Sequence, residues 1–494
     1  MKTYTERLFK GSAFLMAATL LASFIGYLTR IVLARNLSPA EYGLFYAVFA
    51  FVSFFLFFRD LGLNQAMVKF IPELKIKKKY SEIKTTLVSI FTWQSISTLI
   101  MGTFFFILSD FLAENYFRDS NASLMLKLFV IYVIFSMIFL FLQSFFQGFQ
   151  KIYSYSSAEF SRTMIMFVLI FVFFWLGQGV FAPAYAFVLS WVIMSLVMFP
   201  IAVRTFNFFK FKIVDFWGIT KKAFAFGFPV MLANASARLL TKIDVIILTY
   251  FTTLEQVGIY NVVMPTALLF LFLAESAGAV AFPMISELWA KQDKAKLKEW
   301  MKIVYIYSFV IATPVLLMVF SFPKFLINLL FGVDYISGAT ALQILLVAVI
   351  FMIASSLSIT TLLGIGKPAI ATKIILFASV STVVLNLILV PLFGINGAAS
   401  ALLFNYFIMF LLFTRQTSKF VNVKLPLISW TKIVFASTIF VFLVYEVKKQ
   451  LLLNNWIELA ISLVLGGAVY LLLILKITKV VDLNEVKGHL ALLK

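Results

Sequence analysis

Five basic side chains lie inside long apolar stretches of this sequence. They are Arg30, Lys127, Arg162, Arg238 and Lys242. A cation at the centre of a membrane-spanning helix costs about 2.5–3.5 kcal/mol on insertion scales, so each must face a cavity or a partner, or extend to an interface. We interpret Lys127, near the end of its stretch, as extending to the interface. The other four could bind an anionic group or form an internal ion pair.

Residue types that usually carry catalysis are scarce. The chain has no cysteine, which excludes thiol nucleophiles, disulfides and cysteine metal sites, and its one histidine, His489, lies in a charged C-terminal tail. The sequence GIGKP at 364–368 is too short for a nucleotide-binding phosphate loop and ends in proline. We therefore expect no catalytic residue, cofactor or metal. A membrane glycosyltransferase or polymerase would need an acidic metal site or a large polar extramembrane segment, and a scaffold or receptor would leave the five cations unexplained.

The composition identifies the elements that must position these cations. The chain has 494 residues, of which 63% are hydrophobic and 13% charged. Soluble chains carry about 25% charged residues. The charges here cluster between apolar runs of about 20 residues, the length of helix that crosses about 30 Å of hydrocarbon. The sequence thus predicts an all-α polytopic membrane protein, because barrel strands would be short and alternating.

Fourteen transmembrane helices are predicted. They lie near 9–33, 40–60, 83–109, 124–147, 155–177, 180–203, 223–250, 256–283, 302–322, 338–363, 369–392, 396–414, 430–447 and 456–475. The first follows Lys2, Arg7 and Lys10 as a signal peptide would, but its apolar stretch is too long and no clear cleavage site follows it. We interpret it as an uncleaved helix.

The connections between these helices carry most of the net charge of +20. With the N-terminus inside, 31 of the 41 basic residues fall in inside segments and five fall in outside ones. Lys448 and Lys449 are two of these five, so the predicted orientation is least secure for the last pair of helices. This bias predicts a cell (cytoplasmic) membrane protein with both termini cytoplasmic. The same placement argues against nucleic acid as a partner, because that would need a basic face on a folded domain.

The sequence repeats itself after about 215 residues. LTRI at 28–31 recurs as LTKI at 240–243, and EYGLF at 41–45 recurs as QVGIY at 256–260. GFQK at 148–151 matches GIGK at 364–367, and 177–184 parallels 394–401. Six predicted helices separate the copies, so the halves should share one orientation about an axis along the membrane normal.

The repeat predicts the domain organisation. We expect an N-terminal lobe at 1–206 and a C-terminal lobe at 223–420, followed by two helices and a cytoplasmic tail at 421–494. The join at 207–222 alternates aromatic and lysine residues, which suits an amphipathic linker on the cytoplasmic surface.

Several of these segments resemble a known family. They are RIVLARNLSPAEYGLF at 30–45, DLGLNQA at 60–66, LGIGKP at 363–368 and PLFGINGAASA at 391–401. In this order, and over nearly the whole chain, the sequence resembles the polysaccharide biosynthesis family of O-antigen (Wzx-type) lipid-linked oligosaccharide flippases. The resemblance implies the fold of the multidrug/oligosaccharidyl-lipid/polysaccharide (MOP) exporter superfamily: two pseudo-symmetric six-helix lobes around a central cavity, plus two C-terminal helices. It also implies an alternating-access flippase, with glycan polymerase or glycosyltransferase machinery as possible partners.

Two related functions remain as alternatives. Lipid II flippases carry an Arg-Asp pair where Thr29 and Arg30 stand here. Cation-coupled multidrug exporters typically place a carboxylate in the first helix, and this chain has none between Glu6 and Glu41. Both departures favour lipid-linked oligosaccharide as the substrate.

That substrate has an anionic pyrophosphate, which a wet cationic cavity would bind. Arg30 and its repeat equivalent Lys242, with Arg238 one turn away, are our hypothesis for the substrate-binding site, because arginine and lysine both suit phosphate. Asp244 and Glu275 could serve as counter-charges or in ion coupling, or pair with these cations structurally. Asp60, the repeat equivalent of Glu275, is expected to cap or pair locally.

A second pair and a set of polar residues complete the candidates. Glu159 and Arg162, three apart on one predicted helix, should pair with each other. Asn234, among other polar residues in the spans, fits a hydrogen bond to sugar or to a neighbouring helix equally well.

Overall fold

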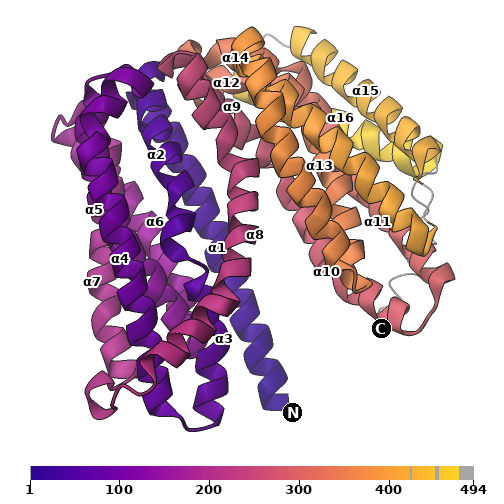
Figure 1. Cartoon of the computed structure of the whole chain (residues 1–494). Helices are drawn as coiled ribbons and strands as arrows, with labels where there is room; N and C mark the ends of the chain where they lie inside the picture. Colours follow the sequence, from indigo (N-terminus) through magenta and orange to yellow (C-terminus); the bar gives the residue numbers. More distant parts are fainter. Residues whose placement is uncertain (1, 423–424, 451–454, 478–494) are drawn as a thin grey trace. The chain divides into compact units, whose positions relative to one another are not determined.

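The computed structural model describes residues 2–422, 425–450 and 455–477. All regular structure in this part of the chain is helical (Figure 1), and every one of the fourteen predicted spans falls on helix. Ten described helical stretches are long and apolar enough to cross a membrane. The four further predicted spans correspond to α8, the α9–α10 pair, the second half of α14, and α16. The predicted all-α polytopic membrane fold is confirmed.

The chain forms two compact units. Unit 1 comprises Met1–Val262 with Leu330–Tyr335, and unit 2 comprises Val263–Leu329 with Ile336–Lys494. The lobe boundaries drawn from the repeat stay a prediction.

Unit 1 contains the first eight α-helices. They are α1 (Lys2–Asn36), α2 (Pro39–Asp60), α3 (Leu63–Ile76), α4 (Tyr80–Leu112), α5 (Asn121–Gly148), α6 (Ile152–Trp175), α7 (Ala182–Thr205) and α8 (Phe216–Phe251). Three short helices interrupt this series: a π-helix at Ala113–Phe117 and 3-10 helices at Gly179–Phe181 and Phe208–Lys210. Helix α5 contacts α4, α6 and α7, and α6 also contacts α7. Helix α1 packs on α6, and α2 packs on α8.

Helix α3, which hydropathy did not predict, follows α2 after a tight turn. Leu61 and Gly62 both have positive φ, 52° and 69°, which ends α2 and turns the chain into α3. A Cβ on Gly62 would lie 2.0 Å from the carbonyl oxygen of Gly227. Only glycine at position 62 therefore permits this backbone approach between the turn and α8.

The predicted linker leads into α8 along the start of α4. Asp215 caps α8, since its carboxylate accepts from the backbone N–H of Gly218 at 3.1 Å. Lys84 Nζ donates to the carbonyl oxygen of Phe211 at 2.7 Å, and the Phe211 ring stacks on Tyr80 with centroids 5.2 Å apart. The backbone and ring of Phe211 thus hold the linker against the first turns of α4.

Unit 2 begins within α9 and contains the remaining helices. The described ones are α9 (Leu254–Leu268), α10 (Leu271–Ala290), α11 (Lys294–Ser321), α12 (Pro323–Leu330), α13 (Ala339–Gly364), α14 (Pro368–Val421), α15 (Leu427–Gln450) and α16 (Asn455–Leu472). A π-helix at Leu473–Ile477 completes the set, and the residues of a 3-10 helix at Val333–Gly338 are divided between the two units. The pairs α13–α14, α10–α13, α11–α15 and α15–α16 are in contact.

Local chemistry sets the ends and breaks of these helices. The predicted span 256–283 is divided at Leu269 and Phe270, between α9 and α10. Two predicted spans meet inside α14 at Gly394, whose φ of 55° and ψ of −131° are not helical. Asp293 caps α11, and its hydrogen bond from the backbone N–H of Lys296 lowers the pKa of the Asp293 carboxyl.

Candidate substrate site

Arg30 is a half-buried cation within α1 that the structure surrounds with neutral groups. Its Nη1 donates to the carbonyl oxygen of Asn261 at 3.2 Å, and its guanidinium lies 4.5 Å from the ring centroid of Tyr46. Among the ion pairs of the described residues, none involves Arg30. A carbonyl dipole and an aromatic face stabilise the cation without neutralising it.

Lys242 reaches the same helix face from α8. Its Nζ lies 5.4 Å from the ring centroid of Phe49. Tyr46 and Phe49 are three residues apart on α2, so they lie on one face, and the two cations approach that face from different helices. The structure therefore brings the repeat equivalents Arg30 and Lys242 to one side of α2 within unit 1. Arg238 lies in α8 one turn before Lys242, and its side chain is outside the described residues.

Asp244, a predicted counter-charge, has partners of its own. Its side chain is 1% exposed. Oδ2 accepts from the Tyr260 hydroxyl at 2.8 Å, and Oδ1 accepts from the backbone N–H of Val245 at 2.9 Å. The bond from Tyr260 joins α9 to α8, which gives Asp244 a structural role in addition to any effect on Lys242. Its proposed part in coupling stays a prediction.

Glu275, the other predicted counter-charge, belongs to unit 2. It lies on α10 and is exposed. Its role in ion coupling also stays a prediction.

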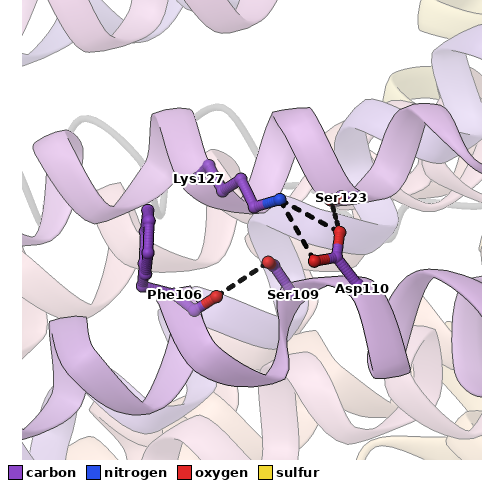
Figure 2. Close-up of polar contacts among 5 residues, drawn as sticks. All are labelled: Phe106, Ser109, Asp110, Ser123 and Lys127. Atoms are coloured by element: carbon purple, nitrogen blue, oxygen red, sulfur yellow. Dashed lines mark hydrogen bonds and ion pairs between the residues drawn. The ribbon is translucent and has the colours of Figure 1, made fainter.

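The two remaining intramembrane cations form local pairs. Arg162 Nε donates to Glu159 Oε2 at 3.1 Å, as the spacing predicts, and the Arg162 guanidinium lies 4.4 Å from the Trp191 ring centroid. Lys127 Nζ lies 3.0 Å from Asp110 Oδ1, and Figure 2 shows this carboxylate between Lys127 and Ser123. The Lys127 side chain is 33% exposed, and that of Asp110 is 70% exposed. Lys127 therefore sits in an exposed pair rather than in the candidate site.

Sequence reasoning missed a polar cavity within unit 1. Its volume is about 530 Å³, and α2, α3, α5, α6 and α8 line it. We call it the amide chamber, after its five carboxamide side chains. These are Asn64, Gln65, Gln143, Gln147 and Asn234. The i, i+4 spacing of Gln143 and Gln147, in an otherwise apolar helix, was the available signal. Asp60 also lines the chamber and accepts from Gln94 Nε2 at 3.0 Å.

Comparison with known proteins identifies the chain. A family model described as "Polysaccharide biosynthesis protein" matches residues 8–289, more than half of the sequence. An uncharacterised membrane protein of Methanocaldococcus jannaschii is 31% identical over 499 residues, which cover 98% of each chain. The chain belongs to the polysaccharide biosynthesis protein family. The predicted family resemblance is thereby confirmed.

Further relatives agree with this family. A protein of Haloferax volcanii named "probable low-salt glycan biosynthesis flippase" is 23% identical over 229 residues, covering 46% of this chain and 48% of that protein. Among solved structures, the lipid II flippase MurJ in an inward closed conformation matches with a TM-score of 0.76 at 16% identity, covering 93% of this chain and 97% of that one. This polysaccharide biosynthesis protein thus has the MOP transporter fold, and the prediction of a transporter is confirmed.

Proposed function

We propose that this protein is an alternating-access flippase for lipid-linked oligosaccharide. Its substrate would be an oligosaccharide on polyprenyl pyrophosphate, which it would move from the cytoplasmic to the outer leaflet of the cell membrane for surface polysaccharide or glycan biosynthesis. Both termini would be cytoplasmic. A glycosyltransferase would supply the substrate, and a glycan polymerase or transferase would consume it.

The observation that carries this proposal is the pair of cations facing α2. Arg30 and Lys242 contact Tyr46 and Phe49, and Arg30 has a carbonyl oxygen rather than a carboxylate as its hydrogen-bond partner. Two basic side chains brought to one helix face inside a membrane protein suit an anionic ligand. A pyrophosphate can accept a bidentate bond from arginine and a single bond from lysine. Arg238, one turn from Lys242, would add a third cation.

The membrane potential would contribute energy to this movement. Two negative charges moving outward across about 100 mV, inside negative, would release roughly 4.6 kcal/mol. The energy for transport therefore need not come from ATP. If H⁺ or Na⁺ moves with the substrate, Asp244 or Glu275 would bind it.

Reconstituted vesicles test this proposal. The purified protein is placed in vesicles with a fluorescent polyprenyl-pyrophosphate oligosaccharide, and a membrane-impermeant quencher reports how much label reaches the outer leaflet. We expect rapid exchange with protein and none in protein-free vesicles. An inside-negative potential should increase the outward fraction.

A hydrophobic fluorescent cation in the same vesicles distinguishes the multidrug exporter. Movement of that cation without movement of the glycolipid would overturn the flippase proposal. Labelled lipid II provides the third arm, and a clear preference for lipid II over other lipid-linked glycans would replace the substrate class proposed above.

A further inference from the structure

The amide chamber differs in charge from the Arg30–Lys242 site. Arg59 lines it and is 2% exposed, and its Nη1 donates to the Val133 carbonyl oxygen at 2.9 Å and to the Ser136 hydroxyl at 2.6 Å. Asp60 is the neighbouring residue along the chain and lines the same chamber. One cation and one anion make the charged lining neutral in sum. The chamber therefore suits a polar ligand without net charge.

The polar groups of the chamber can both give and receive hydrogen bonds. Each of its five carboxamides offers two N–H donors and one carbonyl acceptor. A sugar hydroxyl likewise donates one bond and accepts others, so carboxamides and hydroxyls complement each other. Tyr155 adds a hydroxyl and an aromatic face to the same lining. Phosphate, which only accepts, would leave the carboxamide oxygens without donors.

Asn64 shows that this bonding capacity is not used up within the protein. It is 8% exposed, and its Oδ1 has no hydrogen-bond partner among the described residues. A buried acceptor without a donor destabilises the protein.

We propose that the amide chamber binds sugar rings of the transported glycan. The inference rests on the proposed function and deepens it, because it separates recognition of the neutral sugar from binding of the pyrophosphate by Arg30 and Lys242. The volume of about 530 Å³ lies within the range of about 300–1,000 Å³ typical of small-ligand sites. The chamber holds a short sugar moiety, so the remainder of a long glycan stays outside it.

A single introduced cysteine makes occupancy of the chamber measurable, because the natural chain has none. Ser144→Cys places a thiol on the chamber lining, and Ser120→Cys provides a matched thiol in an exposed turn. The probe is the oligosaccharide released by mild acid from the polyprenyl-diphosphate pool of the source cells. We expect it to slow reaction of the chamber thiol with a water-soluble maleimide several-fold and to leave the Ser120→Cys thiol unaffected. Inorganic pyrophosphate should not protect the chamber thiol.

Variants of the carboxamides show whether the protection comes from the proposed contacts. Gln143→Leu or Gln147→Leu, combined with Ser144→Cys, should abolish protection by the oligosaccharide. Gln178→Leu, in an exposed turn outside the chamber, should retain it. Gln143→Asn keeps the carboxamide on a side chain that is shorter by one methylene. It replaces the leucine variants in this test if they do not fold. Unchanged protection in the folded Gln143 variants, absent protection in the parent, or equal protection by pyrophosphate would overturn the inference.

Transport of the lipid-linked glycan in vesicles separates this inference from the proposed function. If Ser144→Cys is protected and its Gln143→Leu derivative is not, while no lipid-linked glycan moves, the sugar site stands and the flippase proposal fails. If the glycolipid moves at an unchanged rate in folded Gln143→Leu and Gln147→Leu, the flippase proposal stands and the sugar site fails.

Discussion

Gly43 and Gly258 meet backbone to backbone within unit 1. A Cβ on Gly43 would lie 1.8 Å from the carbonyl oxygen of Leu254, and a Cβ on Gly258 would lie 1.9 Å from that of Pro39. Each glycine thus faces the residue four positions before the other, so the contact is symmetric. The two glycines occupy the same position in the two copies of the repeat, EYGLF at 41–45 and QVGIY at 256–260. Equivalent positions of the two repeat copies are therefore in direct contact at the starts of α2 and α9.

Alanine at either of these glycines should prevent the contact. Gly43→Ala and Gly258→Ala each force two helix backbones apart, because the obstructing atoms are carbonyl oxygens rather than movable side chains. We expect a loss of at least about 2–3 kcal/mol of stability, comparable to the larger effects of overpacking. The melting temperature in detergent measures it. Gly26→Ala, which has no atom within 4 Å of the new Cβ, is the control and should melt within a few degrees of the parent.

Gly62→Ala should destabilise the protein by more than the backbone strain of a positive φ alone. The φ of Gly62 is 69°, and its Cβ would also collide with the backbone of Gly227. Gly177 has a similar φ of 71° but open space around it, so Gly177→Ala isolates the cost of a left-handed alanine, about 1–2 kcal/mol. Equal melting temperatures for the two variants would show that the approach of α8 to Gly62 contributes nothing.

Removing the charge of Arg30 or Lys242 should impair transport without unfolding the protein. Arg30→Gln and Lys242→Gln keep hydrogen-bonding capacity but lose the cation, and Arg30→Lys should retain partial activity with weaker head-group binding. Transport is normalised to folded protein, with Lys127→Gln as a control that removes a cation outside the site. Full normalised activity in both glutamine variants would eliminate the phosphate role. If they instead destabilise the fold by several kcal/mol, the cations are structural partners of an acid such as Asp244.

The Glu159–Arg162 pair should contribute to stability rather than to transport. The side chain of Arg162 is only 9% exposed, so Glu159→Gln would leave a largely buried cation with a weaker partner. We expect a loss of about 1–3 kcal/mol and a lower melting temperature. Transport per folded molecule should stay at the parental level, and a selective loss of transport would place this pair in the substrate path.

The exposed ion pair shown in Figure 2 should contribute much less to stability than the Glu159–Arg162 pair. Lys127 and Asp110 lie 3.0 Å apart, but the Asp110 side chain is 70% exposed. Exposed ion pairs contribute about 0–1 kcal/mol, so Lys127→Met should leave the melting temperature nearly unchanged. Added salt should likewise have little effect on the parent. A large destabilisation by Lys127→Met would mean that this lysine has a partner other than Asp110.

The spans and the repeat were predictable because each depends on a short stretch of sequence. An apolar run of about 20 residues must form a helix in a membrane whatever surrounds it, so all fourteen predictions fall on helix. The short helix α3 was not predicted, because it is too short and too polar to register as a span. The Glu159–Arg162 pair was also predictable, since three residues along a helix bring side chains together.

The sequence by itself determined the family, the membrane class and the positions of the intramembrane cations, since composition, periodicity and motifs are properties of the chain alone. The tertiary structure decided what those cations contact. It placed Arg30 and Lys242 against one face of α2, and it engaged Asp244 with Tyr260. It also assembled Asn64, Gln143 and Asn234 into one chamber from three helices. Their separation in sequence is large and no local pattern links them, so only helix packing could bring them together.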